Sequence, residues 1–207
     1  MVKIAVLGLQ GSGKSYFTRE YFLRSQPYHL VIDPMDEYDG FTRYVPHTKL
    51  MENYDSLNQE IALIHRKLVW PNILTLEKQA KGHNKPKRLR MLVYEEADMY
   101  MPSQRLLNAS IRRTYIQCRH MQLDLIAVSR RPTDLNTYVM DVADYLIVFK
   151  ISGANALKTL RNMNADCVDA VRRLSYDKHE FILFDRDRSF EQYTLDTIPD
   201  GIIKMEK

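Results

Sequence analysis

Long apolar runs, a signal sequence and cysteine clusters are all missing from this 207-residue chain. The longest apolar runs have the length of a strand, so we expect no membrane-spanning segment. The first residues lack the charged and then apolar layout of a secretory signal peptide, because a strand-like run starts at residue 2 or 3. Only Cys118 and Cys167 occur, without metal-site spacing, which favours a reducing compartment.

The chain also has no repeat, low-complexity tract or linker, so we expect a single domain over residues 1–207. Hydrophobic residues make up 45% and charged residues 27%, which is ordinary for a globular protein with a sizeable core. The net charge of +4 gives only a mild preference for polyanionic partners.

Glycine is scarce as well, but three of the seven glycines fall within one stretch, Gly8–Ser15. This stretch fits the phosphate-binding pattern G-x-x-x-x-G-K-[ST], between a strand-like run (Lys3–Leu7) and a predicted helix (Tyr16–Leu23). Backbone N–H groups of such a loop converge on a phosphate at the positive end of the helix. We therefore predict a nucleotide site that contains Gly8, Gln10, Gly11, Ser12, Gly13, Lys14, Ser15 and Tyr16. Within it, Lys14 would reach the β- and γ-phosphates and Ser15 would coordinate Mg²⁺.

Two acids follow a second strand-like run, Met91–Tyr94. Acids after a strand are common at surface turns, but together with the phosphate-binding loop they indicate an NTP-hydrolysing site. We predict that Glu95 holds Mg²⁺ through water and that Glu96 polarises the attacking water.

The remaining patterns predict an α/β fold with strands and helices in alternation. His29–Ile32 is a predicted strand that ends in Asp33–Tyr38, and a short extended piece follows at 43–45. Apolar spacing predicts a helix over 54–69, with Leu57, Ile61, Ile64 and Leu68 on one face. A second helix is predicted over 103–121, capped by Ser103, with Leu106, Leu107, Ile111, Tyr115 and Cys118 on one broad face.

The C-terminal half is predicted to add strands at 123–128 and 142–151 and short helices at 154–160 and 165–174. The last two runs, 180–184 and 190–195, predict a terminal β-hairpin. Ser129 and Arg130 end the strand at 123–128, and they can sense a γ-phosphate if that strand lies beside the first one. The arginines of the helix over 103–121 are Arg105, Arg112, Arg113 and Arg119; an arginine at a subunit edge could reach a neighbour's γ-phosphate.

A basic segment, 81–90, holds five cations and no acid. Its Gly and Pro predict a loop. One interpretation is a solvated connection before the next strand. The other is contact with the phosphate backbone of DNA through Lys81, Lys85, Lys87 and Arg88.

The order of these motifs over residues 3–185 resembles the FtsK/HerA superfamily of DNA-pumping ATPases. Asp33-Pro34-Met35-Asp36-Glu37-Tyr38 is similar to the family's DP-x-x-EY. Glu95-Glu96-Ala97-Asp98 with Pro102 is similar to its DEAH…P segment, and Ser129-Arg130-Arg131-Pro132 to its TQRP. Arg119-His120 stands where many members place an arginine finger. The resemblance implies a RecA-like P-loop NTPase fold of the ASCE type, with a mostly parallel sheet.

Because the chain is compact, it is most similar to the genome-packaging ATPases of tailless icosahedral viruses with an internal membrane. That resemblance implies ATP hydrolysis with Mg²⁺, coupled to the movement of double-stranded DNA into a preformed capsid. The implied partners are DNA, further copies of the chain in a ring (expected to be a hexamer) and capsid or vertex proteins. The implied location is the host cytoplasm or the packaging vertex of the virion.

The chain departs from the family pattern at two positions. Glu95 stands where Asp is usual, which adds a methylene that a water-mediated Mg²⁺ contact tolerates. Arg130 stands at the usual Gln of the sensor, so either Ser129 or a cationic Arg130 would sense the γ-phosphate. Arg130 in cis is therefore an alternative to Arg119 in trans. At the level of function, the alternatives are a small-molecule kinase and a virus-assembly ATPase of the Zot type.

Overall fold

One eight-stranded sheet forms the centre of the protein in the computed structural model, which describes residues 1–46, 54–71 and 88–198. The strands are β1 (Lys3–Leu7), β2 (His29–Ile32), β3 (Arg43–Tyr44), β4 (Met91–Tyr94), β5 (Asp124–Ser129), β6 (Tyr145–Phe149), β7 (Phe181–Phe184) and β8 (Phe190–Tyr193). Their order in the sheet is β3-β2-β4-β5-β1-β6-β7-β8. The pairs from β3 to β6 are parallel, and β7 and β8 continue the sheet as an antiparallel hairpin.

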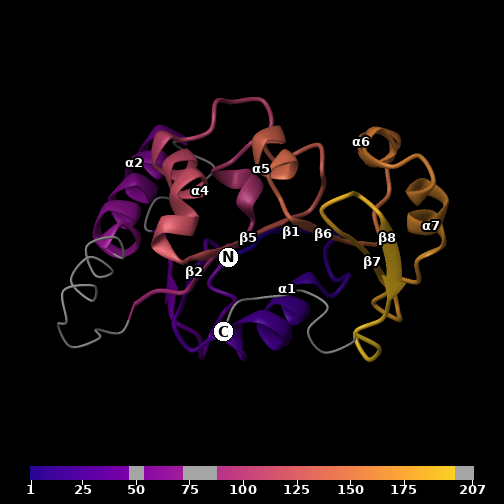
Figure 1. The fold of residues 1–207 in the computed structure, drawn as a ribbon, viewed down its shortest axis with the longest axis horizontal. Coiled ribbons are helices and arrows are strands. Elements are labelled where there is room, and N and C mark those ends of the chain that lie inside the picture. The colour runs from indigo at the N-terminus through magenta and orange to yellow at the C-terminus, as the bar shows by residue number, and fades with distance from the viewer. Residues whose placement is uncertain (47–53, 72–87, 199–207) are drawn as a thin grey trace.

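Helices cover both faces of this sheet (Figure 1). One face carries α1 (Lys14–Phe17) and the π-helical turn Thr18–Leu23. The other face carries α2 (Tyr54–Ile64), α4 (Ala109–Met121), α5 (Thr137–Asp141), α6 (Ala154–Met163) and α7 (Cys167–Arg173). In the parts of the chain that the structure describes, no helix is long and apolar enough to cross a bilayer.

Each central strand contributes to two hydrophobic cores because side chains alternate between the faces of a sheet. In β1, Ile4 and Val6 pack in the core that contains Phe17 and Phe22 of the α1 side. The alternate residue Ala5 lies in the core beneath α2, α4 and α6. Burial on both faces explains why these parallel strands have near-continuous apolar sequences rather than an alternating pattern.

The strand order is of the RecA type, as predicted. β5 pairs directly with β1, so that Leu7 lies opposite Ser129, and β4 lies on the far side of β5. β4, which precedes Glu95 and Glu96, is therefore separated by β5 from β1, which precedes the phosphate-binding loop. The predicted terminal hairpin is also confirmed as β7 and β8.

The predicted helix over 54–69 changes its pitch at its C-terminal end. After α2, residues His65–Val69 form a π-helical turn, in which Trp70 N–H donates to the His65 carbonyl at 2.8 Å. The wider turn moves the buried face by one residue, so Val69 is buried. The prediction that Leu68 shares the buried face is wrong, because its side chain is 48% exposed.

The predicted helix over 103–121 starts six residues later than expected, at Ala109 in α4. Its cap is Asn108, whose side chain accepts the Ser110 N–H at 2.8 Å, and not Ser103. Ser103 lies in the loop before the helix, where it donates its N–H to the carbonyl of Asp134 in the segment after β5. Leu106 therefore does not join the apolar face; it is 96% exposed.

The strand predicted over 142–151 is shorter in the structure, where β6 covers only Tyr145–Phe149. It is preceded by a helix, α5, that the sequence analysis did not predict and whose C-terminal cap is Val142. Asn136 caps the N-terminal end of α5 by accepting the Tyr138 N–H at 3.1 Å.

Leu57, which is buried, and Leu106, which is exposed, provide a matched test of stability. Leu57→Ala removes a fully buried side chain of α2 and should destabilise the protein by about 2–5 kcal/mol. Leu106→Ala removes an exposed side chain and should change stability by less than about 0.5 kcal/mol. Urea unfolding of both variants measures the difference, and equal destabilisation would contradict the position of Leu106.

Candidate active site

The Gly8–Ser15 loop connects β1 to α1 at the carboxyl edge of the sheet. Gly13 caps the helix with φ 106°, a left-handed conformation that favours glycine. Gly8 is required for close approach, because a Cβ there would lie 2.6 Å from Cβ of Phe149 in β6. The loop therefore fits tightly against the sheet and presents the N–H groups of the helix N-terminus to a ligand.

Lys14 folds back over this loop. Its Nζ donates to the Leu9 carbonyl at 2.9 Å, and the side chain is largely buried. Burial lowers the pKa of Lys14, while the nearby charges of Glu95 and Glu96 act in the opposite direction. Ser12, two residues before Lys14, has a buried hydroxyl oxygen for which the structure shows no hydrogen-bond partner.

Ser15 and Glu95 meet where the metal site was predicted. The Ser15 hydroxyl donates to Oε1 of Glu95 at 3.1 Å, and the Tyr38 hydroxyl donates to Oε2 at 2.7 Å. Burial raises the pKa of Glu95 to about 7, against the lowering effect of these two hydrogen bonds. Hydroxyl and carboxylate oxygens are ligands that suit Mg²⁺, so this pair fits the ion.

The described residues contain no cluster of three or more His, Cys, Asp or Glu that could hold a metal by itself. Mg²⁺ commonly takes one or two protein oxygens and completes its shell with substrate phosphates and water. The Ser15–Glu95 pair agrees with that mode of binding.

The segment Asp33–Tyr38 supports Glu95 from the neighbouring strand β2. The buried Asp33 carboxylate accepts the Tyr38 N–H at 2.8 Å, which closes the segment into a tight loop and directs the Tyr38 ring inward. Arg19 packs its guanidinium over that ring, 5.5 Å from its centroid, and donates to the carbonyls of Ser15 and Glu37. The DP-x-x-EY pattern thus has a structural role: its tyrosine donates to the Glu95 carboxylate and orients it beside Ser15. Sequence reasoning missed this role of Tyr38 and the contribution of Arg19.

Glu96 lies beside Glu95 but faces Arg130. The Arg130 guanidinium donates to Oε1 of Glu96 from Nη2 at 3.0 Å and from Nε at 3.2 Å. Ser129, the other predicted sensor, is buried and donates its hydroxyl to Asp98 at 2.8 Å. Arg130 and Glu96 therefore both line the cleft, whereas the Ser129 hydroxyl is hydrogen-bonded to Asp98 and does not line it.

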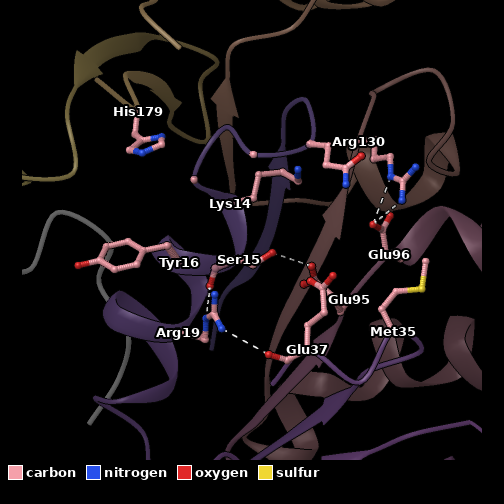
Figure 2. Close-up of a pocket in the computed structure, with 13 residues that line it drawn as sticks. Lys14, Ser15, Tyr16, Arg19, Met35, Glu37, Glu95, Glu96, Arg130 and His179 are labelled. Carbon is pink, nitrogen blue, oxygen red and sulfur yellow. Dashed lines mark hydrogen bonds and ion pairs between the residues drawn. The ribbon is translucent and has the colours of Figure 1, made fainter. Parts of the chain in front are cut away.

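These residues line one open cleft of about 520 Å³ (Figure 2). Its walls come from the phosphate loop, α1 and the π-helical turn after it, the segments after β2 and β4, the turn after β5 and the segment before β7. They comprise Gln10, Gly11, Gly13, Lys14, Ser15, Tyr16, Arg19, Met35, Glu37, Glu95, Glu96, Arg130 and His179. The structure thus brings together most of the predicted nucleotide, metal and water-activating residues.

Sequence reasoning missed a segment before β7 that packs on the phosphate loop. His179 Nδ1 lies 3.1 Å from the Ser12 carbonyl, and the Tyr176 hydroxyl donates to the Gln10 carbonyl at 2.5 Å. His179 and the exposed ring of Tyr16 also line a second hollow, of about 410 Å³, next to the cleft. The second hollow continues from the end of the cleft where Figure 2 shows His179 and Tyr16.

The structure does not bring Arg119 to this cleft. Arg119 is exposed near the C-terminal end of α4 and lines a separate hollow with Met1, Lys3, Asp144 and Arg186. That hollow lies where β1 and β6 begin, which is the sheet edge opposite to the phosphate loop. Arg119 can therefore act only on the site of another copy, and that role stays a prediction.

Of the predicted DNA contacts, Lys81, Lys85 and Lys87 lie outside the described residues. Arg88 is described, and its guanidinium donates to the side chain of Gln122 at the C-terminal end of α4. Arg90 donates to the same oxygen at 3.0 Å.

No protein-family profile matches the chain, and no curated protein matches its sequence. Solved structures do match. The genome-packaging NTPase B204 from Sulfolobus turreted icosahedral virus 2, in complex with AMPPCP, superposes with a TM-score of 0.67 at 19% identity. The match covers 93% of this chain and 97% of that one. The chain has the fold of these packaging NTPases.

Two further structures have similar folds. The pCW3 conjugation coupling protein TcpA, in its monomer form with ATPγS, matches with a TM-score of 0.57 at 14% identity, over 93% of this chain and 59% of TcpA. The N-terminal domain of zonular occludens toxin from Neisseria meningitidis matches with a TM-score of 0.50 at 12% identity, over 95% and 96% of the two chains. The fold implied by the FtsK/HerA resemblance is thus confirmed.

Tyr38→Phe tests the support of the metal-side carboxylate. It keeps the buried ring but removes the hydroxyl that donates to Glu95, so Mg²⁺-dependent nucleotide affinity should fall by about 10-fold or more. Titration of a fluorescent ATP analogue with and without Mg²⁺ measures this loss.

The matched control is Tyr94→Phe, which removes an equally buried hydroxyl whose partner is His65 rather than Glu95. It should cost about 1 kcal/mol of stability and leave Mg²⁺ dependence intact. Equal effects of both variants on Mg²⁺ dependence would contradict a specific role for Tyr38.

Proposed function

We propose that this chain is an ATP-hydrolysing motor that moves double-stranded DNA, and that it packages a viral genome into a preformed capsid. The observation that carries the proposal is the content of one cleft. A phosphate-loop lysine, a hydroxyl–carboxylate pair suited to Mg²⁺ and a second carboxylate all line it. The match to a genome-packaging NTPase over nearly the full length of both chains supports the packaging role.

In this proposal, Lys14 leaves the Leu9 carbonyl to contact the β- and γ-phosphates of ATP, and the helix N-terminus and the loop N–H groups bind the same groups. Ser15 would coordinate Mg²⁺ and Glu95 would hold it through water, and the charge of the ion would stabilise the negative charge of the transferring phosphoryl group. Glu96 orients the attacking water in line with the scissile bond. The nucleoside extends toward the second hollow, where Tyr16 and His179 offer rings for stacking.

The motor is proposed to act as a ring, expected to be a hexamer, with Arg119 of one copy stabilising the transition state in the site of the next. Lys81, Lys85, Lys87 and Arg88 of the basic segment (81–90) would contact DNA phosphates without recognising a base sequence. Capsid or vertex proteins are the proposed docking partners, and the host cytoplasm or the packaging vertex is the proposed location.

A virus-assembly ATPase of the Zot type is the second candidate, because the chain shares its fold with the zonular occludens toxin domain. The two candidates differ in their response to DNA. Linear duplex DNA should raise the ATPase rate of the purified protein severalfold, and this stimulation should decline steeply with salt. Hydrolysis that is indifferent to DNA would favour the assembly function.

Glu96→Gln should bind ATP and fail to turn it over, with kcat reduced about 10²–10⁴-fold, because the amide cannot accept the proton of the attacking water. Lys14→Ala should lose nucleotide binding itself. A filter-binding assay with labelled ATP, run beside a phosphate-release assay, separates the two defects. Substantial turnover by Glu96→Gln would remove Glu96 from its proposed role.

Arg119→Ala should keep nucleotide binding, because Arg119 lies far from the cleft of its own copy. It should lose hydrolysis, because the site of the neighbouring copy no longer receives the Arg119 guanidinium. Mixing it with Glu96→Gln subunits should restore part of the ATPase rate, because some sites then combine an intact Glu96 with an intact Arg119. The control is the same mixture with Lys14→Ala in place of Glu96→Gln, which should behave in the same way. Absence of rescue in both mixtures would argue for Arg130 or another residue in cis.

A further inference from the structure

The carboxylate that is proposed to orient the attacking water is already engaged in this structure. Two N–H groups of Arg130 donate to one oxygen of Glu96, at 3.0 and 3.2 Å. These two bonds hold the Glu96 carboxylate against the turn that follows β5. Figure 2 shows the pair at one end of the cleft, turned away from Ser15 and Glu95.

The protein backbone builds this pairing into the site. Glu96 is the second residue after β4, and Arg130 is the first residue after the neighbouring strand β5. Glu96 adopts a left-handed backbone conformation with φ 46°, which is unfavourable for a residue with a Cβ and which aims its side chain at the end of β5. The hydrogen bond from Ser129 to Asp98 ties the two strand ends together.

The Arg130 guanidinium is also within reach of a triphosphate. It lines the same cleft as Lys14, and its charge contributes to lowering the pKa of Lys14. Its side chain is 44% exposed, compared with 18% for Glu96, so it can rotate without unpacking a core. Arginine binds phosphate oxygens through the same forked geometry that it uses for carboxylates.

We propose that Arg130 is a positioning residue that exchanges Glu96 for the γ-phosphate when ATP binds. In the absence of a triphosphate, Arg130 holds Glu96 away from the water position. When a γ-phosphate is present, the guanidinium moves to it, and Glu96 becomes free to accept a hydrogen bond from the attacking water. The ion pair is partly exposed and therefore weak, which allows the exchange. This inference rests on the proposed ATP hydrolysis, but not on the coupling to DNA.

A double-mutant cycle on nucleotide binding tests the exchange. The affinities of Mg²⁺ with the non-hydrolysable analogue AMPPCP, and of Mg²⁺ with ADP, are measured by calorimetry. The four proteins are the unmodified chain, Glu96→Gln, Arg130→Gln and the double variant. Glu96→Gln releases Arg130, so it should tighten AMPPCP binding about three- to fivefold, the size expected for one partly exposed charge pair. In the Arg130→Gln background the same change should tighten it less than twofold.

The affinity for ADP distinguishes the proposed exchange of Arg130 from a general electrostatic effect of Glu96→Gln. Removing a negative charge from the cleft favours any anion, but only a γ-phosphate should gain from the release of Arg130. The effect of Glu96→Gln on ADP affinity should therefore be the same in both backgrounds. Equal tightening of AMPPCP in both backgrounds would overturn the proposal, as would a coupling of the same size for ADP.

Two further variants make the cycle specific. Arg19→Gln removes another cation of the cleft, one that does not contact Glu96, and should leave the effect of Glu96→Gln unchanged. Arg130→Lys keeps the charge but loses the two-donor geometry, and should retain part of the coupling. All readouts are binding constants, so a failure of ATP hydrolysis or of DNA stimulation would be seen separately, in the assays of the proposed function.

Discussion

Parallel pairing of β2, β4, β5 and β1 is the constraint on which the site depends. Parallel strands end at the same edge of a sheet, so the segments that follow them meet even though they are far apart in the chain. The register places Tyr94 beside both Ile32 and Ala127, and Leu7 beside Ser129. In the chain, the phosphate loop directly follows Leu7, the two acids directly follow Tyr94, and the turn that contains Arg130 directly follows Ser129. Helices on both faces keep the strands buried and in register.

Within that edge, Glu95 connects the separate segments. It is a buried carboxylate that accepts hydrogen bonds from the phosphate loop through Ser15 and from the β2 segment through Tyr38. Its neighbour Glu96 is more exposed and pairs with the turn after β5. Two adjacent acids therefore have different environments: Glu95 is buried between two hydroxyl donors, and Glu96 is partly exposed and paired with Arg130. This difference accompanies a sharp turn of the backbone at Glu96.

Much of this could be predicted from the sequence, because the phosphate loop and the paired acids are short contiguous motifs flanked by apolar strands. The hairpin and the strand order followed from the same patterns and from the family resemblance. The contacts of Tyr176 and His179 with the loop could not be predicted, since they join residues more than 160 positions apart. The pairing of Glu96 with Arg130 depends on side-chain geometry that no spacing rule describes. The local errors also have physical causes: a π-helical turn exchanged Leu68 for Val69, and a better cap at Asn108 delayed the start of α4.

We propose that ATP hydrolysis in this cleft moves the protein along duplex DNA. A triplex-displacement assay tests it most directly, because a motor that advances along a duplex removes a third strand bound in its path. We expect displacement that requires ATP and Mg²⁺, fails with AMPPCP, and is abolished by Glu96→Gln while DNA binding persists. Robust, DNA-stimulated ATP hydrolysis without any displacement of the third strand would contradict it.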